Sequence, residues 1–226
     1  MDTLIDNWPD IWDGFETTLW LSLFAGIAAG LLGTLMGSMR VSPVTVLRAV
    51  GTTYVNIFRN TPLVVVLILV VAGLPELGFN NWDIDLGFRE FNTFFVFGTL
   101  GLSLYTGAFV CEAVRSGINS VDPGQTEASR SIGMNFTQTL QQVVLPQAFR
   151  SVVPPLASVY IAMAKNTSVL AIFGVTEATY QMKRLGNNFS SDLYWIFGGI
   201  SLGYVVIVLT ISGVAAVLER KLAVAR

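Results

Sequence analysis

Five long runs of apolar residues, each nearly free of charge, alternate with more polar segments along the chain. A helix needs about 20 apolar residues to cross the ~30 Å hydrocarbon core of a bilayer, and each run is long enough. Backbone groups in lipid must be satisfied within their own segment, which favours helices over open strands. The pattern predicts an all-α polytopic membrane protein, a single domain over residues 1–226, with spans at 17–39, 50–75, 92–113, 151–175 and 193–218.

The composition agrees with a membrane protein. The 226 residues are 53% hydrophobic and only 12% charged, with a mean hydropathy of +0.62. A soluble domain carries about 25% charged residues. The net charge of −2 gives no basic field for nucleic acid. With no histidine and a single cysteine, Cys111, we expect no internal disulfide, no metal site and no catalytic residue.

Basic residues predict the orientation of the spans. With the N-terminus outside the cell, the inner segments hold eight basic residues: Arg40, Arg48, Arg115, Arg130, Arg150, Arg220, Lys221 and Arg226. The outer segments hold three: Arg89, Lys183 and Arg184. Basic residues concentrate on the cytoplasmic side of membrane proteins, so we expect the N-terminus outside and the C-terminus in the cytoplasm.

Glycines in two of the runs suggest close helix packing. The first run places four on roughly one face, and the fifth run adds a G-x-x-x-G pair: Gly26, Gly30, Gly33, Gly37, Gly199 and Gly203. Small residues allow helix backbones to approach one another in membranes. Packing within the subunit is the favoured interpretation, and an interface between subunits is the alternative.

The segment between the third and fourth runs is not a simple connector. Asp122, followed by proline, is a typical helix start, and Gly133 is a typical helix end. Asn135 can cap a second helix, which we expect to end before Pro146. The sequence therefore predicts a cytoplasmic helix hairpin over 122–146, and an ordered hairpin suggests docking to a partner.

This hairpin contains a motif with a known counterpart. Glu127-Ala128-Ser129 is followed by three residues, Gly133, nine residues and then Val143-Val144-Leu145-Pro146. The spacing resembles the EAA loop of bacterial ATP-binding-cassette (ABC) importer permeases, with Ser129 in place of Ala and Val143 in place of Ile. The resemblance implies that ATPase coupling residues are Glu127, Ala128, Gly133, Leu145 and Pro146.

Further motifs extend the resemblance to about residues 15–220. Arg59-Asn60-Thr61-Pro62-Leu63 resembles the Arg-Gly-Thr-Pro-Leu motif of the polar amino-acid branch, with Asn60 replacing Gly. Lys165-Asn166-Thr167-Ser168 resembles its Lys-x-Thr-Ser element. Other matching positions lead into the hairpin: Glu112, Arg115, Gly117, Gly124 and Gln125. As a whole, the chain resembles a glutamate-uptake permease of Gram-positive bacteria.

The resemblance implies a type I ABC importer transmembrane domain in the bacterial cell membrane. It would translocate a polar amino acid, glutamate first and glutamine as the alternative, by ATP-driven alternating access. No Gly-Lys pair occurs, so the chain has no phosphate-binding P-loop. ATP and Mg would therefore sit on two partner ATPase subunits, and this chain would bind no cofactor. A second permease, itself or a paralogue, and an extracellular substrate-binding protein would complete the complex.

Charges inside the apolar runs are the candidates for the substrate pathway. A central lysine costs at least ~2.5 kcal/mol on insertion scales, so Lys165 should face protein or water. It could attract the substrate carboxylate, or it could pair with helix-end carbonyls or Glu112. Arg59 could serve the pathway or snorkel to the inner surface. The full candidate set is Lys165, Thr167, Ser168, Arg59, Thr61, Pro62 and Glu112.

Local backbone chemistry provides an alternative role for three of these residues. Pro62 should break or kink its helix, since proline lacks an N–H and cannot continue the ladder. The hydroxyls of Thr167 and Ser168 could bond to substrate or to the preceding helical turn, and the turn is favoured.

The sequence gives less support to two other functional classes. An ion-driven secondary transporter usually has two halves with matching broken helices, and no internal repeat is visible here. An intramembrane enzyme could use Lys165 and Ser168 as a nucleophile pair. Their spacing only places them on one helix face, and no oxyanion-hole motif accompanies them. An ATPase that copurifies with the chain would separate the importer from both.

Overall fold

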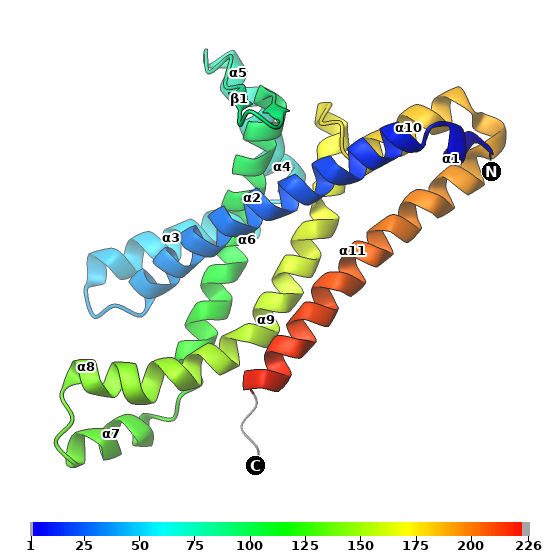
Figure 1. The fold of residues 1–226 in the computed structure, drawn as a ribbon. Coiled ribbons are helices and arrows are strands. Elements are labelled where there is room, and N and C mark those ends of the chain that lie inside the picture. The colour runs from blue at the N-terminus through cyan, green and yellow to red at the C-terminus, as the bar shows by residue number, and fades with distance from the viewer. Residues whose placement is uncertain (1, 223–226) are drawn as a thin grey trace.

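The first, third and fifth apolar runs form long helices. The computed structural model describes residues 2–222, so Arg226 lies outside the described residues. The chain begins with the short helix α1 (Asp2–Asp6). The three long helices that follow from these runs are α2 (Trp8–Arg40), α6 (Thr93–Asn119) and α11 (Leu193–Leu222). Figure 1 shows α2 and α11 joined at one end by α1 and α10, with α6 and α9 beside them.

Helix α2 begins earlier than the predicted span. Pro9 lies in its first turn, where the missing N–H is unneeded, and the helix starts at Trp8 instead of residue 17. The extra turns carry acidic side chains that pair with basic residues of later segments. Arg89 lies 2.9 Å from Asp13, and Arg184 pairs with Asp10.

The second apolar run is not one straight helix, which confirms the break predicted at Pro62. Helix α3 (Thr45–Asn60) ends where the chain bends by 107°, as expected for Pro62. Thr61 is extended, with φ −99° and ψ 130°, because a residue before proline avoids the helical region. The chain continues as α4 (Leu63–Leu67), the π-helical η1 (Ile68–Ala72) and α5 (Gly73–Glu76).

The second helix of the hairpin does not stop before Pro146, so the predicted end of that helix is wrong. Helix α8 (Phe136–Thr139) continues through π-helical η2 (Leu140–Val144) into α9 (Leu145–Asn166). Pro146 lies in the first turn of α9, and the π turn before it accommodates a residue that cannot donate a backbone N–H. A 3-10 segment, η3 (Thr167–Phe173), follows α9.

The hairpin caps agree with the prediction. Asp122 caps α7 (Pro123–Ser131) by accepting a hydrogen bond from the Gly124 amide. Gly133 has φ +88°, the left-handed conformation that favours glycine after a helix. Asn135 begins α8 through a capping box with Gln138.

The segments that connect the long helices contain elements that the sequence analysis did not predict. Strand β1 (Ile84–Asp85) pairs antiparallel with β2 (Glu90–Phe91), with Ile84 opposite Phe91. Helix α10 (Ala178–Asn188) and the 3-10 turn η4 (Ser190–Asp192) precede α11. Helix α10 packs on both α2 and α11.

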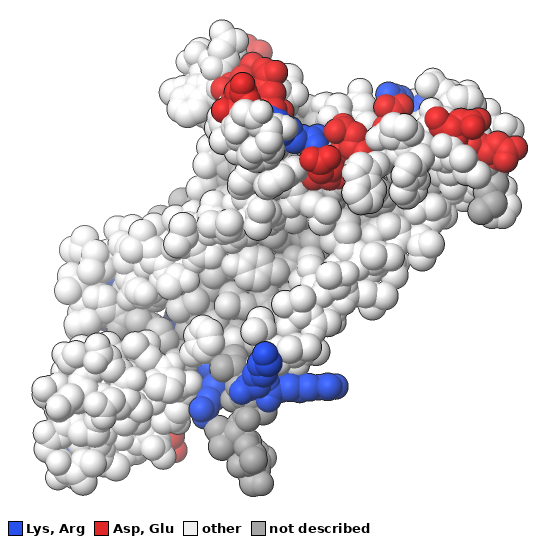
Figure 2. All heavy atoms as spheres, viewed as in Figure 1, with Lys and Arg blue, Asp and Glu red and all other residues white. Residues whose placement is uncertain are grey.

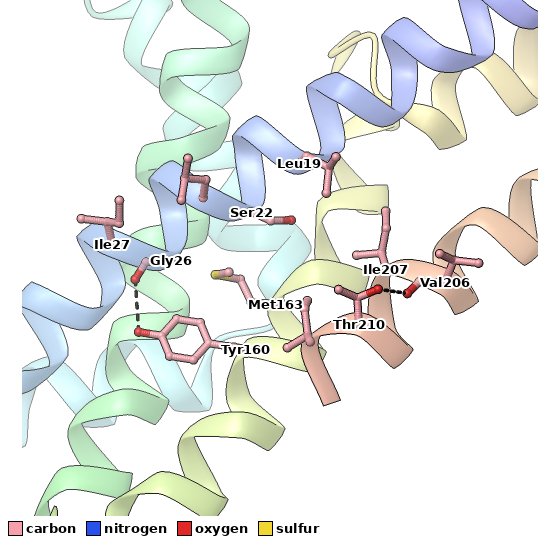
Figure 3. A pocket seen from close by; sticks show the side chains of 11 residues that line it. Leu19, Ser22, Gly26, Ile27, Tyr160, Met163, Val206, Ile207 and Thr210 are labelled. Atoms are coloured by element: carbon pink, nitrogen blue, oxygen red, sulfur yellow. Dashed lines mark hydrogen bonds between the residues drawn. The ribbon is translucent and has the colours of Figure 1, made fainter. Parts of the chain in front are cut away.

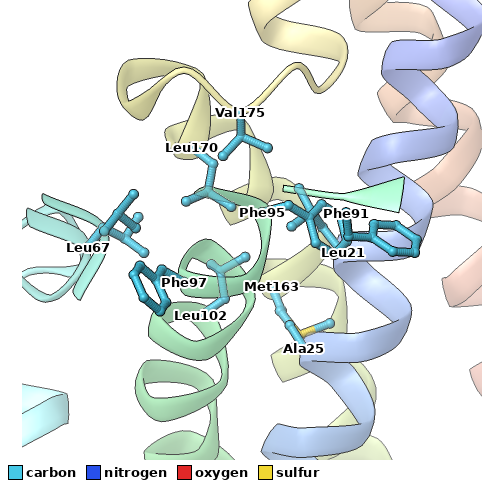
Figure 4. Close-up of a cluster of buried hydrophobic side chains, with 11 residues drawn as sticks. Leu21, Ala25, Leu67, Phe91, Phe95, Phe97, Leu102, Met163, Leu170 and Val175 are labelled. Carbon is cyan, nitrogen blue, oxygen red and sulfur yellow. The ribbon is translucent and has the colours of Figure 1, made fainter. Parts of the chain in front are cut away.

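The main core lies where α2, α6, η1, α9 and η3 meet (Figure 4). Its fully buried side chains include Leu21, Leu67, Leu102 and Leu170. The glycines of α2 pack within the subunit, as favoured above: a Cβ on Gly33 would lie 2.6 Å from the Gly107 carbonyl oxygen of α6. In the same way, Gly203 of α11 contacts the Phe15 ring of α2.

Charges separate along the molecule (Figure 2). Acidic side chains gather over α1, the start of α2 and the β1–β2 hairpin, and basic side chains gather near the end of α11. Four described helices, or five if the broken pair α3 and α4–α5 counts as one, are long and apolar enough to cross a membrane. The molecule is therefore an all-α polytopic membrane protein.

Candidate coupling and transport sites

The α7–α8 hairpin presents the coupling candidates. Glu127, Ala128 and Gly133 are all exposed. Ser129, which departs from the EAA pattern, points inward: its hydroxyl lies 3.0 Å from that of Thr139 and donates to the Thr126 carbonyl. The serine therefore closes the hairpin and leaves the rest of the motif on its surface.

The hairpin also exposes apolar side chains that a soluble surface would not carry. Ile132 and Phe136, on either side of Gly133, are 80% and 69% exposed. Leu145 and Phe149 are exposed on the following turns. Exposed apolar side chains around a rigid turn form a surface suited to a protein partner.

Lys165 lies in the last turn of α9 and lines a cavity of about 300 Å³ between α9, α10 and α11. No carboxylate lines this cavity among the described residues. Hydroxyl groups share it with the ammonium group, and the full lining is Lys165, Ser168, Thr179, Met182, Phe197, Ile200, Ser201 and Tyr204. Lysine and hydroxyl donors together favour a ligand with a carboxylate or another anionic group.

Two neighbours of Lys165 bond to the preceding turn, as favoured above. Thr167 is buried and donates to the Ala164 carbonyl at 2.8 Å, and Ser168 donates to the Lys165 carbonyl at 2.7 Å. Thr167 is therefore occupied within the protein, whereas Ser168 still lines the cavity.

Glu177 is a site residue that the sequence analysis missed. Its side chain is fully buried and caps α10, accepting hydrogen bonds from the amides of Thr179 and Tyr180. Tyr204 of α11 donates to the same carboxylate, and Thr18 of α2 accepts from the next amide, that of Ala178. An acidic residue at a helix N-cap after an apolar run is the signal that could have found it.

Burial raises the pKa of the Glu177 carboxyl above its usual range, although the hydrogen bonds from Tyr204 and the α10 amides act in the opposite direction. This network fixes α10 and α11 beside the Lys165 cavity, because Thr179 and Tyr204 belong to both.

Asn166 faces a different cavity from its neighbour Lys165. The second cavity, of about 350 Å³, lies between α6 and α9. It is lined by Tyr105, Thr106, Phe109, Ser158, Val159, Ala162, Met163 and Asn166. The Lys-Asn-Thr-Ser element therefore contributes to two separate hollows on opposite sides of α9.

A larger cavity of about 690 Å³ separates α2 from α11 and is almost entirely apolar (Figure 3). Tyr160 of α9 borders it and donates to the Gly26 carbonyl at 3.2 Å. Leu19, Ile27 and Ile207 are typical of its lining, which offers little to orient a polar ligand.

Glu112 does not pair with Lys165, which corrects one alternative considered above. Its carboxylate instead receives Arg40 at 2.6 Å, Arg59 at 3.3 Å and Arg115 at 3.6 Å. The ion pair with Glu112 therefore connects Arg59 of α3 to α6. On the same helix end, Thr61 donates to the carbonyl of Ile57.

Residues 29–224 match the family described as binding-protein-dependent transport system inner membrane component. The chain belongs to this family. It is therefore the membrane component of such a transport system, a multi-pass protein of the cell membrane and not an enzyme in its own right. Among the described residues, no group of three or more histidine, cysteine or acidic side chains could hold a metal.

Some relatives match this chain over almost its whole length. The chain is 37% identical to the glutamate transport system permease protein GluC of Corynebacterium efficiens, covering 99% of both chains. It is 33% identical to the probable glutamine ABC transporter permease protein GlnM of Bacillus subtilis, covering 97% of this chain and 96% of that one. Among solved structures, an amino acid ABC transporter crystallised with histidines matches 96% of each chain, with a TM-score of 0.84 and 29% identity.

Proposed function

We propose that this permease imports a polar amino acid, with glutamate as the first candidate and glutamine as the second. The observation that carries the proposal is the Lys165 cavity, which a lysine and several hydroxyl groups line without a carboxylate among the described residues. The glutamate and glutamine permeases to which the chain is similar along its whole length support the same substrate class.

Electrostatics explains why an anionic amino acid suits this cavity. A fixed cation in a medium of low dielectric constant attracts a carboxylate more strongly than it would in water. Glutamate offers two carboxylates and glutamine one, whereas the side chain of arginine would be repelled. Ser201 also lines the cavity and adds a hydroxyl that can donate to the bound group.

The α7–α8 hairpin is proposed to couple transport to ATP hydrolysis. Glu127, Ala128, Gly133, Leu145 and Pro146 would contact a partner ATPase, and the exposed Ile132 and Phe136 would enter its groove. ATP and Mg would bind to two such ATPases. Their closure would move the hairpins as rigid bodies, because α8 continues without a stop into α9.

A second permease, this chain or a paralogue, and an extracellular binding protein complete the proposed complex. The N-terminus would lie outside, which places the acidic face over α1 and α2 toward the binding protein and the basic end of α11 in the cytoplasm. In a Cys111→Ser background, cysteines at Asp6 and Glu219 should react with an impermeant maleimide from opposite sides. Labelling of both from one side would contradict this orientation.

The decisive experiment is uptake by the complex reconstituted with its ATPase and binding protein. Radiolabelled glutamate, glutamine, aspartate and arginine are compared, each with ATP or a non-hydrolysable analogue inside the vesicles. We expect ATP-dependent glutamate uptake. Uptake of arginine alone would overturn the electrostatic argument, and uptake driven by an ion gradient without ATP would favour a secondary transporter.

A further inference from the structure

Three arginines surround one carboxylate where α2, α3 and α6 meet. Arg40, at the end of α2, makes the shortest ion pair with Glu112, at 2.6 Å. Arg59 and Arg115 approach the same carboxylate at 3.3 Å and 3.6 Å.

The cluster has an excess of positive charge. Arg40, Arg59 and Arg115 contribute three charges and Glu112 neutralises one. Residues 41–60 contain no acidic side chain that could neutralise another.

Two of these guanidinium groups retain free donors. The side chains of Arg59 and Arg115 are 52% and 43% exposed, whereas that of Arg40 is 10% exposed. A guanidinium has five N–H donors. Within the described part of the chain, Arg59 uses one of them, on Glu112, and Arg115 lies beyond hydrogen-bonding distance of its carboxylate. Both can therefore donate to another anionic group without breaking a strong bond.

Helix α3 places apolar side chains beside this charge. Its buried face, with Gly51 and Val55, packs on α2 and α6. Its other faces expose apolar side chains to the surroundings: Val46, Leu47, Val50 and Ile57. An amphipathic helix with arginines beside an exposed apolar face is typical of the lipid headgroup boundary.

We propose that Arg59 and Arg115 bind the headgroup phosphate of an anionic phospholipid, whose acyl chains lie along the exposed apolar residues of α3. Guanidinium groups bind phosphate through paired N–H donors, and basic pockets between membrane helices on the cytoplasmic side bind such headgroups. A phospholipid supplies both the phosphate and the apolar chains that this surface fits. A free carboxylate, such as that of a substrate, supplies a negative charge but no apolar chains.

Native mass spectrometry of the purified full chain tests this site directly. The chain is titrated with phosphatidylglycerol or with phosphatidylcholine, and bound lipid is counted. In Arg59→Gln/Arg115→Gln, apparent affinity for phosphatidylglycerol should fall about 30-fold, since each basic residue near an anionic lipid contributes about fivefold. The charge-conserving Arg59→Lys/Arg115→Lys should keep most of the affinity.

A matched control removes the same charge elsewhere. Arg220→Gln/Lys221→Gln neutralises two basic residues in the last turn of α11, away from the cluster, and should change the affinity less than about threefold. Arg115→Gln alone, which loses only the 3.6 Å contact, provides a mild variant if the double variant does not fold. Its affinity should fall about fivefold.

Three results would overturn the proposal. The control variant could lose as much phosphatidylglycerol as the cluster variant, which would indicate general surface electrostatics. Phosphatidylcholine could bind equally well, which would remove the role of the negative charge. Free glutamate could displace the lipid one for one, which would assign the cluster to substrate. Transport activity is not part of the measurement, so its outcome is independent of the proposed substrate.

Discussion

The hydroxyl oxygens of Ser129 and Thr139 lie 3.0 Å apart in the buried seam between α7 and α8. The Ser129 hydroxyl also donates to the Thr126 carbonyl of its own helix, 2.8 Å away. The bond therefore joins two short helices that have little other surface to bury against each other. It explains why the EAA segment of this chain tolerates a serine: the position faces the hairpin interior and not its surface.

Removing this bond should loosen the hairpin. Ser129→Ala and Thr139→Val are each expected to cost about 1 kcal/mol of local stability. The double variant should cost little more than either single one, because the two residues share one bond. Hydrogen exchange of the amides in 123–144 measures the effect. Fully additive costs would show that the two hydroxyls act independently.

Gly133 tests the coupling role of the hairpin. A residue other than glycine at φ +88° costs about 1–2 kcal/mol, and no atom lies within 4 Å of an added Cβ, so the cost is conformational and not steric within the chain. Gly133→Arg should still insert in the membrane but lose most substrate-stimulated ATP hydrolysis. Gly133→Asn is the control, since asparagine tolerates this conformation. Stimulated hydrolysis at the parental rate in Gly133→Arg would contradict coupling through this turn.

Replacing Lys165 should reduce substrate transport without affecting assembly of the complex. Lys165→Met keeps much of the side-chain length and removes a charge that is costly in a membrane, so insertion should not suffer. Glutamate transport at limiting concentration should fall at least tenfold. Lys183→Met, on the exposed surface of α10, removes the same charge outside the cavity and serves as the control. Equal losses in both variants would point to a general effect of charge.

Glu177 should stabilise the packing of α10 against α11 through its hydrogen bonds. In Glu177→Gln one acceptor oxygen becomes an amide nitrogen, which cannot accept. If the remaining oxygen keeps the bonds from the Thr179 amide and Tyr204, the Tyr180 amide loses its acceptor. One buried donor is left without a partner, at a cost of about 1–3 kcal/mol. Thermal unfolding in detergent measures this loss. An unchanged melting temperature would mean that the network is not needed for stability.

The pH dependence of stability provides a second test of Glu177. Its pKa in the folded chain is raised by burial above the usual value of 4.5. Folding therefore favours the protonated form, so this contribution is fully present below about pH 4.5 and is lost as the pH rises through the folded pKa. We expect melting temperature to fall over that window in the parent and to fall less in Glu177→Gln. The same slope in both proteins would assign it to other groups.

Gly33 should be intolerant of even a methyl group. A Cβ there would lie 2.5 Å from the Val110 Cβ, so Gly33→Ala must separate α2 from α6 and should cost about 1–3 kcal/mol. Gly213→Ala in α11 is the matched control, because no atom lies within 4 Å of its added Cβ. The two melting temperatures should differ clearly. Similar values would show that α2 and α6 can move apart without loss.

Local chemistry was enough to predict the helix ends of the hairpin and the break at Pro62. Asp122, Asn135 and Gly133 act through hydrogen bonds and backbone angles within a few residues of themselves, so their effects are visible in the sequence. The family motifs depend on spacing in the same way. These features did not require knowledge of which helices meet.

The sequence did not predict that the helix continues through Pro146. A proline after a helical pattern normally indicates a stop. Here the preceding turn widens into a π-helix, and that choice depends on how α8 and α9 are placed by the rest of the chain. The hairpin and the fourth long helix thus became one continuous element.

The sequence by itself determined the class of the protein, the number of apolar runs, the hairpin caps and the family, because these depend on composition and short-range spacing. Only the tertiary structure decided which charges meet. It brought Glu112 to three arginines and left Lys165 in a cavity without a lining carboxylate within the described residues. It also placed Glu177 against Tyr204. An ion pair depends on distances of a few ångströms between separate helices, and those distances are set by packing that no local pattern contains.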